Sequence, residues 1–221
     1  VIEIGLASTD GLYFASGSLD LPGAMFTASH NPAQYNGIKL CRAGAAPVGQ
    51  DSGLREISEL ISQGIASADT YSLGSVSARD VLPEYARYLR ELVPVEAGRH
   101  LTVVVDAGNG MGGFTVPAVL GTAAGLPELP LTIIPMYFEL DGSFPNHEAN
   151  PIEPANLVDL QKAVVEHQAD LGLAFDGDAD RCFVIDHNGD AVTPSAITAL
   201  IATRELARHP GSNVIHNLIT S

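Results

Sequence analysis

The chain has 221 residues, enough for one large domain or two small ones with a buried core. Its 11 Lys plus Arg against 26 Asp plus Glu give a formal charge of −15, which argues against nucleic-acid binding, since phosphate backbones require clustered cations. The apolar share of 46% argues against disorder, and no apolar run is long enough to span a bilayer. We therefore expect an acidic globular protein of the cytoplasm, with neither nucleic acid nor membrane as a partner.

Short β-rich runs alternate with helical stretches, a pattern typical of layered α/β architecture. Apolar periodicity and capping residues predict, in the first part of the chain, a strand end at 1–4, a helix capped by Ser8, Thr9 or Asp10 and ending near Leu19, strands at 24–27 and 37–41, a helix capped by Asp51 and a helix around 82–92. Further along the chain they predict strands at 101–105 and 131–135, a helix at 155–168, strands at 170–175 and 182–186, a helix at 195–209 and a strand at 214–218.

The composition of the sequence changes at 69–79, where small and polar residues predominate, and we interpret this stretch as an inter-domain linker. The nearly all-apolar strand at 101–105 is expected to be central and parallel. We predict consecutive three-layer α/β/α domains with mixed sheets, divided as 1–77, 78–190 and 191–221, the first and third incomplete. The chain starts inside an apolar segment and without Met, which suggests a piece of a larger protein.

Two cysteines are too few for a disulfide framework or a zinc site, so a reducing compartment fits. Cys182 lies in the apolar run 182–185, and we expect it to be a buried free thiol. No basic segment followed by an apolar one precedes the first strand, so no secretion signal is visible.

The first candidate site is the run TASHNP at 27–32, followed by Lys39 on the next strand. Ser29 comes just after a strand end, where α/β folds place ligands. A serine there can accept a phosphoryl group if a base removes its proton and cations neutralise the charge. The alternative is an ordinary polar turn in which Ser29 caps and His30 makes a local hydrogen bond.

The second candidate site is the run DGDADR, which follows the strand at 170–175. Asp176, Asp178 and Asp180 stand at alternate positions of one turn and repel one another unless a cation lies among them; such hard oxygen ligands suit Mg²⁺. An EF-hand is excluded because its positions 6 and 12 hold Arg181 and His187. A solvated acidic turn remains the alternative.

Two further runs carry weaker signals. The glycine turn at 106–113 matches neither the dinucleotide fingerprint nor the P-loop, so we interpret its glycines as serving a tight strand-to-helix turn. The run PNHEANP at 145–151 lies in a long loop of the kind that lines sites, although a cluster of turns explains it equally well.

Together, TASHNPAQYNGIK and FDGDADRC resemble the α-D-phosphohexomutases, and in particular the bacterial phosphomannomutase/phosphoglucomutase group. DAGNG at 106–110 and PNH at 145–147 add to the resemblance, which covers essentially the whole chain. It implies an enzyme that interconverts hexose 6-phosphate and hexose 1-phosphate through a phosphoserine and a hexose 1,6-bisphosphate. Ala179 stands where many members have Gly.

The resemblance also implies residue roles. Ser29 would be the phosphoserine; Asp176, Asp178, Asp180 and an oxygen of phospho-Ser29 would hold Mg²⁺. Lys39 would be a general acid/base, His30 would steady the phosphate or a substrate hydroxyl, and Arg181 would contact the phosphoryl group or the sugar phosphate. The same resemblance places Asn31, His147 and Arg181 in contact with a phosphosugar substrate.

Family members are longer, so we expect most substrate contacts to come from domains of the same polypeptide that these residues do not include, and we expect poor turnover from this chain alone. Three alternatives stay open: a phosphoglucosamine mutase, a Mg²⁺-dependent sugar phosphatase with an aspartate nucleophile, and a phosphosugar-binding module without activity. Intact Ser29, Lys39 and aspartates argue against the last of these.

Overall fold

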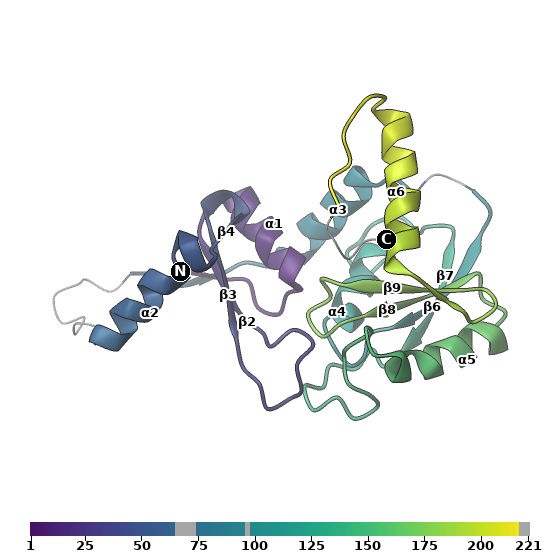
Figure 1. The fold of residues 1–221 in the computed structure, drawn as a ribbon, viewed down its shortest axis with the longest axis horizontal. Coiled ribbons are helices and arrows are strands. Elements are labelled where there is room, and N and C mark those ends of the chain that lie inside the picture. The colour runs from purple at the N-terminus through teal and green to yellow at the C-terminus, as the bar shows by residue number, and fades with distance from the viewer. Residues whose placement is uncertain (65–73, 96–97, 217–221) are drawn as a thin grey trace.

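A computed structural model describes residues 1–64, 74–95 and 98–216. Short strands and helices alternate along most of the chain (Figure 1). The strands are β1 (Ile2–Glu3), β2 (Gly23–Phe26), β3 (Ile38–Arg42), β4 (Ala46–Pro47), β5 (Ser77–Ala78), β6 (Leu101–Asp106), β7 (Leu131–Met136), β8 (Leu171–Phe175), β9 (Cys182–Asp186) and β10 (Ala191–Val192). The α-helices are α1 (Thr9–Leu19), α2 (Leu54–Gln63), α3 (Leu82–Leu92), α4 (Gly112–Val119), α5 (Val158–Glu166) and α6 (Pro194–Arg208).

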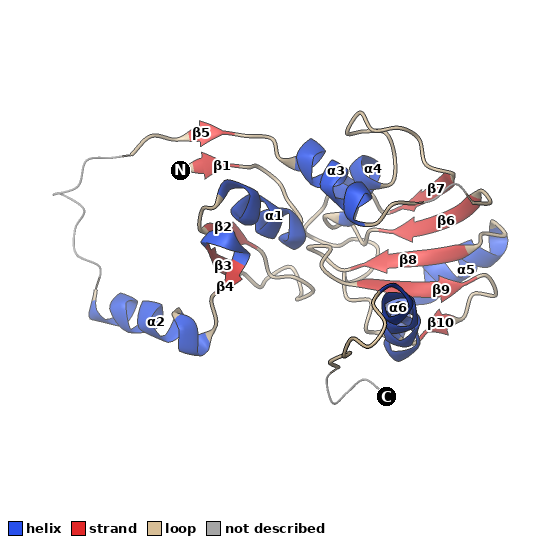
Figure 2. Cartoon of the chain, turned by 90° about the horizontal axis from the view of Figure 1, so that it is seen from above, coloured by secondary structure: helices blue, strands red, loops and turns tan. Residues whose placement is uncertain are grey.

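The second half of the chain is built on a five-stranded mixed sheet in the order β10-β9-β8-β6-β7. As predicted, β6 runs parallel to both of its neighbours, β7 and β8, while β9 and β10 continue the sheet antiparallel (Figure 2). Because β6 and β8 are parallel neighbours, their carboxyl ends meet at one edge of the sheet, where ligands of α/β folds bind.

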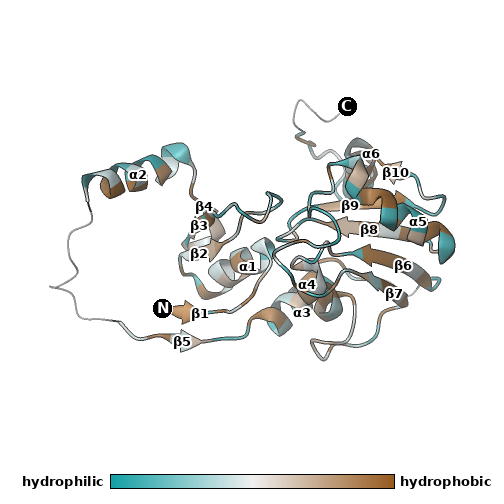
Figure 3. Ribbon diagram, turned by 90° about the horizontal axis from the view of Figure 1, so that it is seen from below, coloured by the Kyte–Doolittle hydropathy of each residue, from teal (hydrophilic) through white to brown (hydrophobic). Residues whose placement is uncertain are grey.

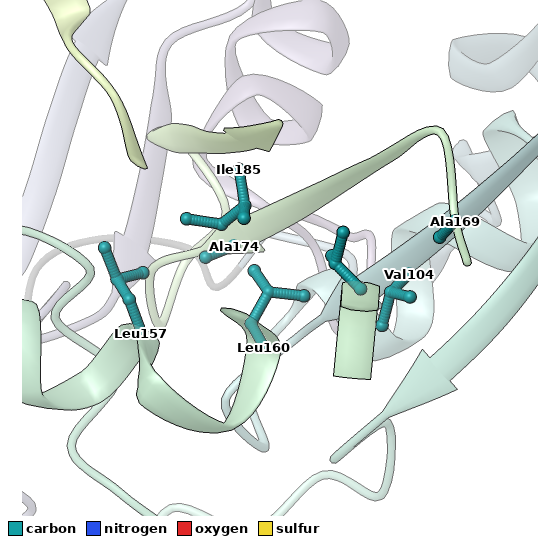
Figure 4. Close-up of a cluster of buried hydrophobic side chains, with 7 residues drawn as sticks. Val104, Leu157, Leu160, Ala169, Ala174 and Ile185 are labelled. Carbon is teal, nitrogen blue, oxygen red and sulfur yellow. The ribbon is translucent and has the colours of Figure 1, made fainter. Parts of the chain in front are cut away.

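Helices cover both faces of this sheet, so this half has the expected three layers. Figure 4 shows Leu160 of α5 beside Val104 of β6 and Ile185 of β9, and all three side chains are fully buried. On the other face, Val116 of α4 packs with the alternate β6 residues, among them Val105. The alternation follows from the period of two along a strand.

The first half contains a three-stranded sheet, β2-β3-β4, with α1 packed on it. The hydroxyl of Ser8 caps α1 by accepting a hydrogen bond from the amide of Gly11, as the sequence predicts. Helix α2 stands apart from the two sheets in the ribbon views (Figure 2 and Figure 3). Its apolar side chains, such as Leu60 and Ile61, are exposed.

Several sequence expectations need correction. Asp51 does not cap α2: the cap residue is Gly53, and Asp51 lies in a preceding 3-10 turn and pairs with Arg55 at 2.9 Å. The expected linker at 69–79 is not wholly irregular, since β5 pairs in parallel with β1; its residues 69–73 lie outside the described residues. The expected helix at 155–168 begins as a 3-10 turn, Pro154–Leu157.

The last predicted strand and the predicted environment of Cys182 also differ from the structure. Residues 214–216 form no strand, and 217–218 lie outside the described residues. Cys182 is exposed rather than buried; it is the first residue of β9 and lies beyond the two β9 residues, Val184 and Ile185, that pair with β10. Within the described parts of the chain, every helix is too short or too polar to cross a membrane.

Candidate active site

Ser29 lies in the loop between β2 and β3. This loop is closed at its base by the amide of Thr27, which donates to the carbonyl of Gly37 at 3.0 Å. A second bond runs from the amide of Ser29 to the hydroxyl of Thr27 at 2.8 Å. Ser29 has φ of +54°, a left-handed conformation that non-glycine residues rarely adopt and that often marks functional positions.

The acidic run DGDADR turns the chain from β8 into β9. The amide of Ala179 donates to the carbonyl of Asp176 at 3.0 Å, and Ala179 has φ of +57°. One carboxylate oxygen from each of Asp176, Asp178 and Asp180 lies within 4.8 Å of the others. The turn therefore gathers three hard oxygen donors at the carboxyl end of β8, a set that fits a divalent cation such as Mg²⁺.

The tertiary structure brings the serine to this acidic turn. The hydroxyl of Ser29 lies 3.2 Å from Oδ2 of Asp176 and 3.1 Å from Oδ1 of Asp178, across 147 and 149 residues of sequence. The Nδ1 atom of His30 lies 3.3 Å from the same hydroxyl. The two sequence motifs thus form one site.

Asp178 is the most heavily hydrogen-bonded of the three carboxylates. Its Oδ2 atom accepts from Thr9 at 2.8 Å, from Thr27 at 3.0 Å and from the Lys39 ammonium at 2.7 Å. Burial raises the pKa of this carboxyl, but the hydrogen bonds from Lys39 and Thr9 outweigh burial, so its pKa is lowered and the charged form is favoured.

Asp176 is fully buried, and its pKa shifts in the opposite direction from that of Asp178. Its Oδ1 atom accepts from the amide of Arg181 at 3.0 Å, and its Oδ2 atom accepts from the Nε of Arg181 at 2.9 Å. Burial and the neighbouring charge of Asp178 raise the pKa of Asp176 despite these bonds. A cation among the carboxylates would relieve both effects.

Lys39 returns to the site from β3. Its ammonium lies 2.7 Å from both Asp178 and Asp180 and 3.0 Å from the Thr9 hydroxyl. Burial lowers the pKa of Lys39, and the hydrogen bonds to the two aspartates more than offset that, so its pKa is raised and the side chain is held as a cation.

Two residues that the resemblance assigns to the substrate, Asn31 and His147, form side-chain hydrogen bonds to groups other than Ser29 and the acidic turn. The side-chain amide of Asn31 donates to the carbonyl of Ala28 at 2.8 Å and so braces its own turn. His147 lies 2.9 Å from Asp106 through Nε2 and 2.9 Å from the carbonyl of Glu148 through Nδ1. Neither has a hydrogen bond to Ser29 or to the acidic turn among the described residues.

The glycine turn at 106–113 supports the acidic turn rather than offering a phosphate cradle of its own. The amide of Met111 donates to the carbonyl of Gly177 at 2.9 Å, and a Cβ at Gly110 would lie 2.6 Å from that same oxygen. Gly177 in turn touches the serine loop, because a Cβ there would lie 2.3 Å from the carbonyl oxygen of Ser29. This agrees with the interpretation that the glycines permit close backbone approach.

A groove of about 1150 Å³ opens beside the site. Its lining includes Ser29, Asn31 and Asp178 together with apolar residues of α1 and β2. It offers room for a ligand beside the serine hydroxyl.

Sequence reasoning missed Thr9 and Thr27 as site residues. The sequence indicates only a candidate helix cap at Thr9 and a strand end at Thr27. A sequence signal was available for Thr27, which belongs to the TASHNP run, but Thr9 lies outside both motifs.

Comparisons with known proteins agree with this geometry. The family model described as "Phosphoglucomutase/phosphomannomutase, alpha/beta/alpha domain I" matches residues 1–67, and the one for "alpha/beta/alpha domain II" matches residues 83–189. A phosphomannomutase of Vibrio cholerae is 39% identical over 218 residues, which is 98% of this chain and 47% of that protein. A phosphomannomutase of Escherichia coli is 40% identical over 98% of this chain and 48% of its own length.

Solved structures give the same result. A phosphoglucomutase/phosphomannomutase family protein of Burkholderia thailandensis has a TM-score of 0.77 at 30% identity and matches 96% of this chain and 45% of its own. A structure described as a phosphomannomutase of Thermus thermophilus has a TM-score of 0.77 at 25% identity. The chain spans about half the length of the curated relatives it matches.

Proposed function

The chain belongs to the phosphoglucomutase/phosphomannomutase family, and from that premise we propose that it carries the phosphoryl-transfer centre of a phosphohexomutase. The proposed reaction interconverts hexose 6-phosphate and hexose 1-phosphate, of mannose or glucose, through a phosphoserine and a hexose 1,6-bisphosphate. One observation carries the proposal: the hydroxyl of Ser29 lies 3.1–3.2 Å from two members of a cluster of three aspartates.

In this proposal, Asp176, Asp178, Asp180 and an oxygen on Ser29 hold Mg²⁺. The bound cation would neutralise charge on the transferring phosphoryl group and orient it. Three carboxylates and two basic side chains, Lys39 and Arg181, leave a local charge of about −1 before any phosphate enters, so a divalent cation is needed to bring a phosphoryl group to Ser29.

The basic residues have separate proposed tasks. When the phosphoryl group passes from the bisphosphate to Ser29, the Oγ–P bond forms and the P–O bond to the sugar breaks. His30, at 3.3 Å from the hydroxyl, is placed to take the serine proton. Lys39 is the proposed general acid/base: because its pKa is raised, it begins protonated and would supply a proton to the sugar oxygen that leaves.

Substrate contacts are proposed for Arg181, Asn31 and His147. Arg181 borders Asp176 and can reach a phosphate that enters beside it. We further propose that the chain is organised as a phosphoserine domain at 1–77, a metal-binding domain at 78–190 and the start of a sugar-binding domain at 191–221.

The test is phosphoryl uptake by the protein. Incubation with Mg²⁺ and a hexose 1,6-bisphosphate is expected to add about 80 Da, the mass of one phosphoryl group, at Ser29 by intact mass and peptide mapping. The Ser29→Ala variant should take up none, whereas Ser58→Ala, a change on the exposed face of α2, should behave as the parent. Comparing mannose, glucose and glucosamine phosphates as acceptors then separates a phosphoglucosamine mutase.

A phosphoryl group that maps to Asp176 instead of Ser29 would favour the phosphatase alternative, in which an aspartate is the nucleophile. The geometry disfavours this, because both oxygens of Asp176 already accept hydrogen bonds from Arg181. No uptake at either residue would leave only the binding module.

A further inference from the structure

The two oxygens of the Asp178 carboxylate have different surroundings. Oδ2 accepts from the Thr9 hydroxyl at 2.8 Å, the Thr27 hydroxyl at 3.0 Å and the Lys39 ammonium at 2.7 Å. Oδ1 has one neighbour of this kind, the Ser29 hydroxyl at 3.1 Å. The donors thus gather on the oxygen that faces away from the serine.

The direction of both threonine hydroxyl bonds is fixed by their other partners. The ammonium of Lys39 and the amide of Ser29 can only donate, so Thr9 accepts from Lys39 at 3.0 Å and Thr27 accepts from Ser29 at 2.8 Å. Each hydroxyl is left with its proton free to donate to Asp178. The other acceptor near Thr9, the sulfur of Met25 at 3.5 Å, is a weak one.

Three donors saturate one carboxylate oxygen, which has about two lone-pair sites. Asp178 and Thr9 are each 2% exposed, so water does not compete for these bonds. Only Oδ1 of Asp178 remains open toward the cluster of aspartates and Ser29.

We propose that Thr9 and Thr27 are specificity-determining residues for the metal ion. By occupying Oδ2 they restrict Asp178 to one ligating oxygen and so select Mg²⁺ over Ca²⁺. Mg²⁺ requires a compact octahedral shell, whereas Ca²⁺ accepts six to eight oxygens and uses bidentate carboxylates. This inference rests on the proposed function, since it assumes that the aspartates hold a divalent cation.

Backbone hydrogen bonds hold both threonines in place against Asp178. Thr9 is the first residue of α1, and its amide donates to the carbonyl of Asp178 at 3.0 Å, so side chain and backbone both hold the turn. Thr27 joins the amide of Ser29 to Asp178 through one hydroxyl. The first half of the chain thereby sets how a ligand in the second half can bind.

The experiment compares Mg²⁺ and Ca²⁺ affinities by titration calorimetry in the full, unphosphorylated protein. The double variant Thr9→Val/Thr27→Val keeps both side-chain shapes, removes both hydroxyls and leaves Lys39 as the remaining one of the three donors to Oδ2. Removing a group that orients a metal ligand typically weakens binding about 10- to 100-fold. We expect that loss for Mg²⁺ and a smaller one for Ca²⁺, because a released Oδ2 can join a larger shell; the affinity ratio should shift toward Ca²⁺ by roughly tenfold.

Matched variants separate this effect from a general loss of structure. Thr27→Ser keeps the hydroxyl and should retain the parent ratio. Thr203→Val makes the same chemical change on the exposed side of α6 and should leave both affinities unchanged. If the double variant does not fold, Thr9→Cys combined with Thr27→Cys, with weakly donating thiols of similar size, replaces it, and the same shift is expected.

Two outcomes overturn the proposal: an equal loss of both affinities, which indicates a structural role, and unchanged affinities. A parent protein that binds neither cation refutes the proposed metal site itself, together with this inference. A parent that binds Mg²⁺ alongside variants that keep its ratio refutes the inference alone.

Discussion

At the scale of single residues, the site depends on backbone conformations that most side chains avoid. Ser29 and Ala179 both have positive φ, at +54° and +57°, and both belong to turns that build the site. For Ser29 the conformation places the hydroxyl against the aspartates. Ala179 has only a methyl side chain, which takes no part in hydrogen bonding, so a substitution that relieves its strain removes no polar contact.

We predict that Ala179→Gly stabilises the protein. A left-handed conformation costs an alanine about 1–2 kcal/mol, while the added freedom of glycine in the unfolded chain costs about 0.4–1 kcal/mol, which leaves a net gain of roughly 0.5–1 kcal/mol. Urea unfolding measures it. Ala199→Gly within α6 is the control and should destabilise by up to about 1 kcal/mol. Destabilisation by Ala179→Gly would contradict the argument.

His147 is held by acceptors at both ring nitrogens. Its partners are the Asp106 carboxylate and the Glu148 carbonyl, each at 2.9 Å, and the ring of Tyr137 packs edge-on against it. Both nitrogens must donate to satisfy these acceptors, so the doubly protonated ring fits best. The hydrogen bond to Asp106 raises the pKa of His147 above 6.5, although burial opposes it; Asp159 adds a smaller attraction.

This shift predicts a pH dependence of stability. Because the pKa is raised on folding, the contribution of the charged ring is complete below the unfolded value of 6.5 and is lost as pH rises through the higher folded value. The unfolding free energy should therefore fall more between about pH 6 and about pH 9 in the parent than in His147→Asn. The exposed His167→Asn change should keep the parent slope. Equal slopes in the parent and His147→Asn would rule this out.

At the scale of elements, one arginine side chain connects two helices. Helix α3 is fixed to the end of α4 through Arg90, whose guanidinium donates from Nε to the carbonyl of Val119 at 2.7 Å and from its two terminal nitrogens to the carbonyls of Gly121 and Pro127. These are carbonyls at or beyond the end of α4, where helices leave acceptors unpaired. One planar cation thus joins two helices and the loop that follows.

We predict that Arg90→Lys destabilises the protein by about 2–3 kcal/mol, because a single ammonium cannot reproduce the forked geometry and a hydrogen bond to a charged group contributes about 1.5–3 kcal/mol. Arg87→Lys, on the exposed side of the same helix, should change stability by less than about 0.5 kcal/mol. The midpoints of denaturant unfolding curves measure the stability change of each variant, provided that the m-value stays constant. Similar losses in the two variants would show that Arg90 has no special role.

At the scale of the whole molecule, the two halves of the chain meet at the acidic turn. Thr9, Ser29 and Lys39 from the first half all contact Asp178 in the second. The backbones also touch there, since Gly177 leaves no room for a Cβ beside the carbonyl of Ser29. The site is therefore formed at the contact between the two halves, and each half contributes residues to it.

We predict that Gly177→Ala weakens the contact between the serine loop and the acidic turn. A Cβ placed 2.3 Å from the carbonyl oxygen of Ser29 must push the serine loop away. Hydrogen exchange of amides in 27–37 should rise by roughly tenfold, the equivalent of about 1.4 kcal/mol of local stability, while β6 and β8 stay protected. Gly142→Ala, where no atom lies within 4 Å of the added Cβ, is the control. Unchanged exchange in the loop would contradict the prediction.

Much of the local structure was determined by the sequence itself. Capping at Ser8, the apolar strand at 101–106, the glycine turn after it and the two site motifs all depend on near neighbours in the chain, and the structure contains each of these elements. Local propensity, capping and period-two patterns act over a few residues, which is why they can be read directly.

Only the tertiary structure decided which of these residues meet. It placed Ser29 beside aspartates nearly 150 residues away, made Thr9 a partner of Asp178 rather than a helix cap, left Cys182 exposed, and turned part of an expected linker into β5. The physical reason is that burial and hydrogen bonding across the chain depend on how the sheets and helices pack, and no local pattern specifies the face of a neighbouring element.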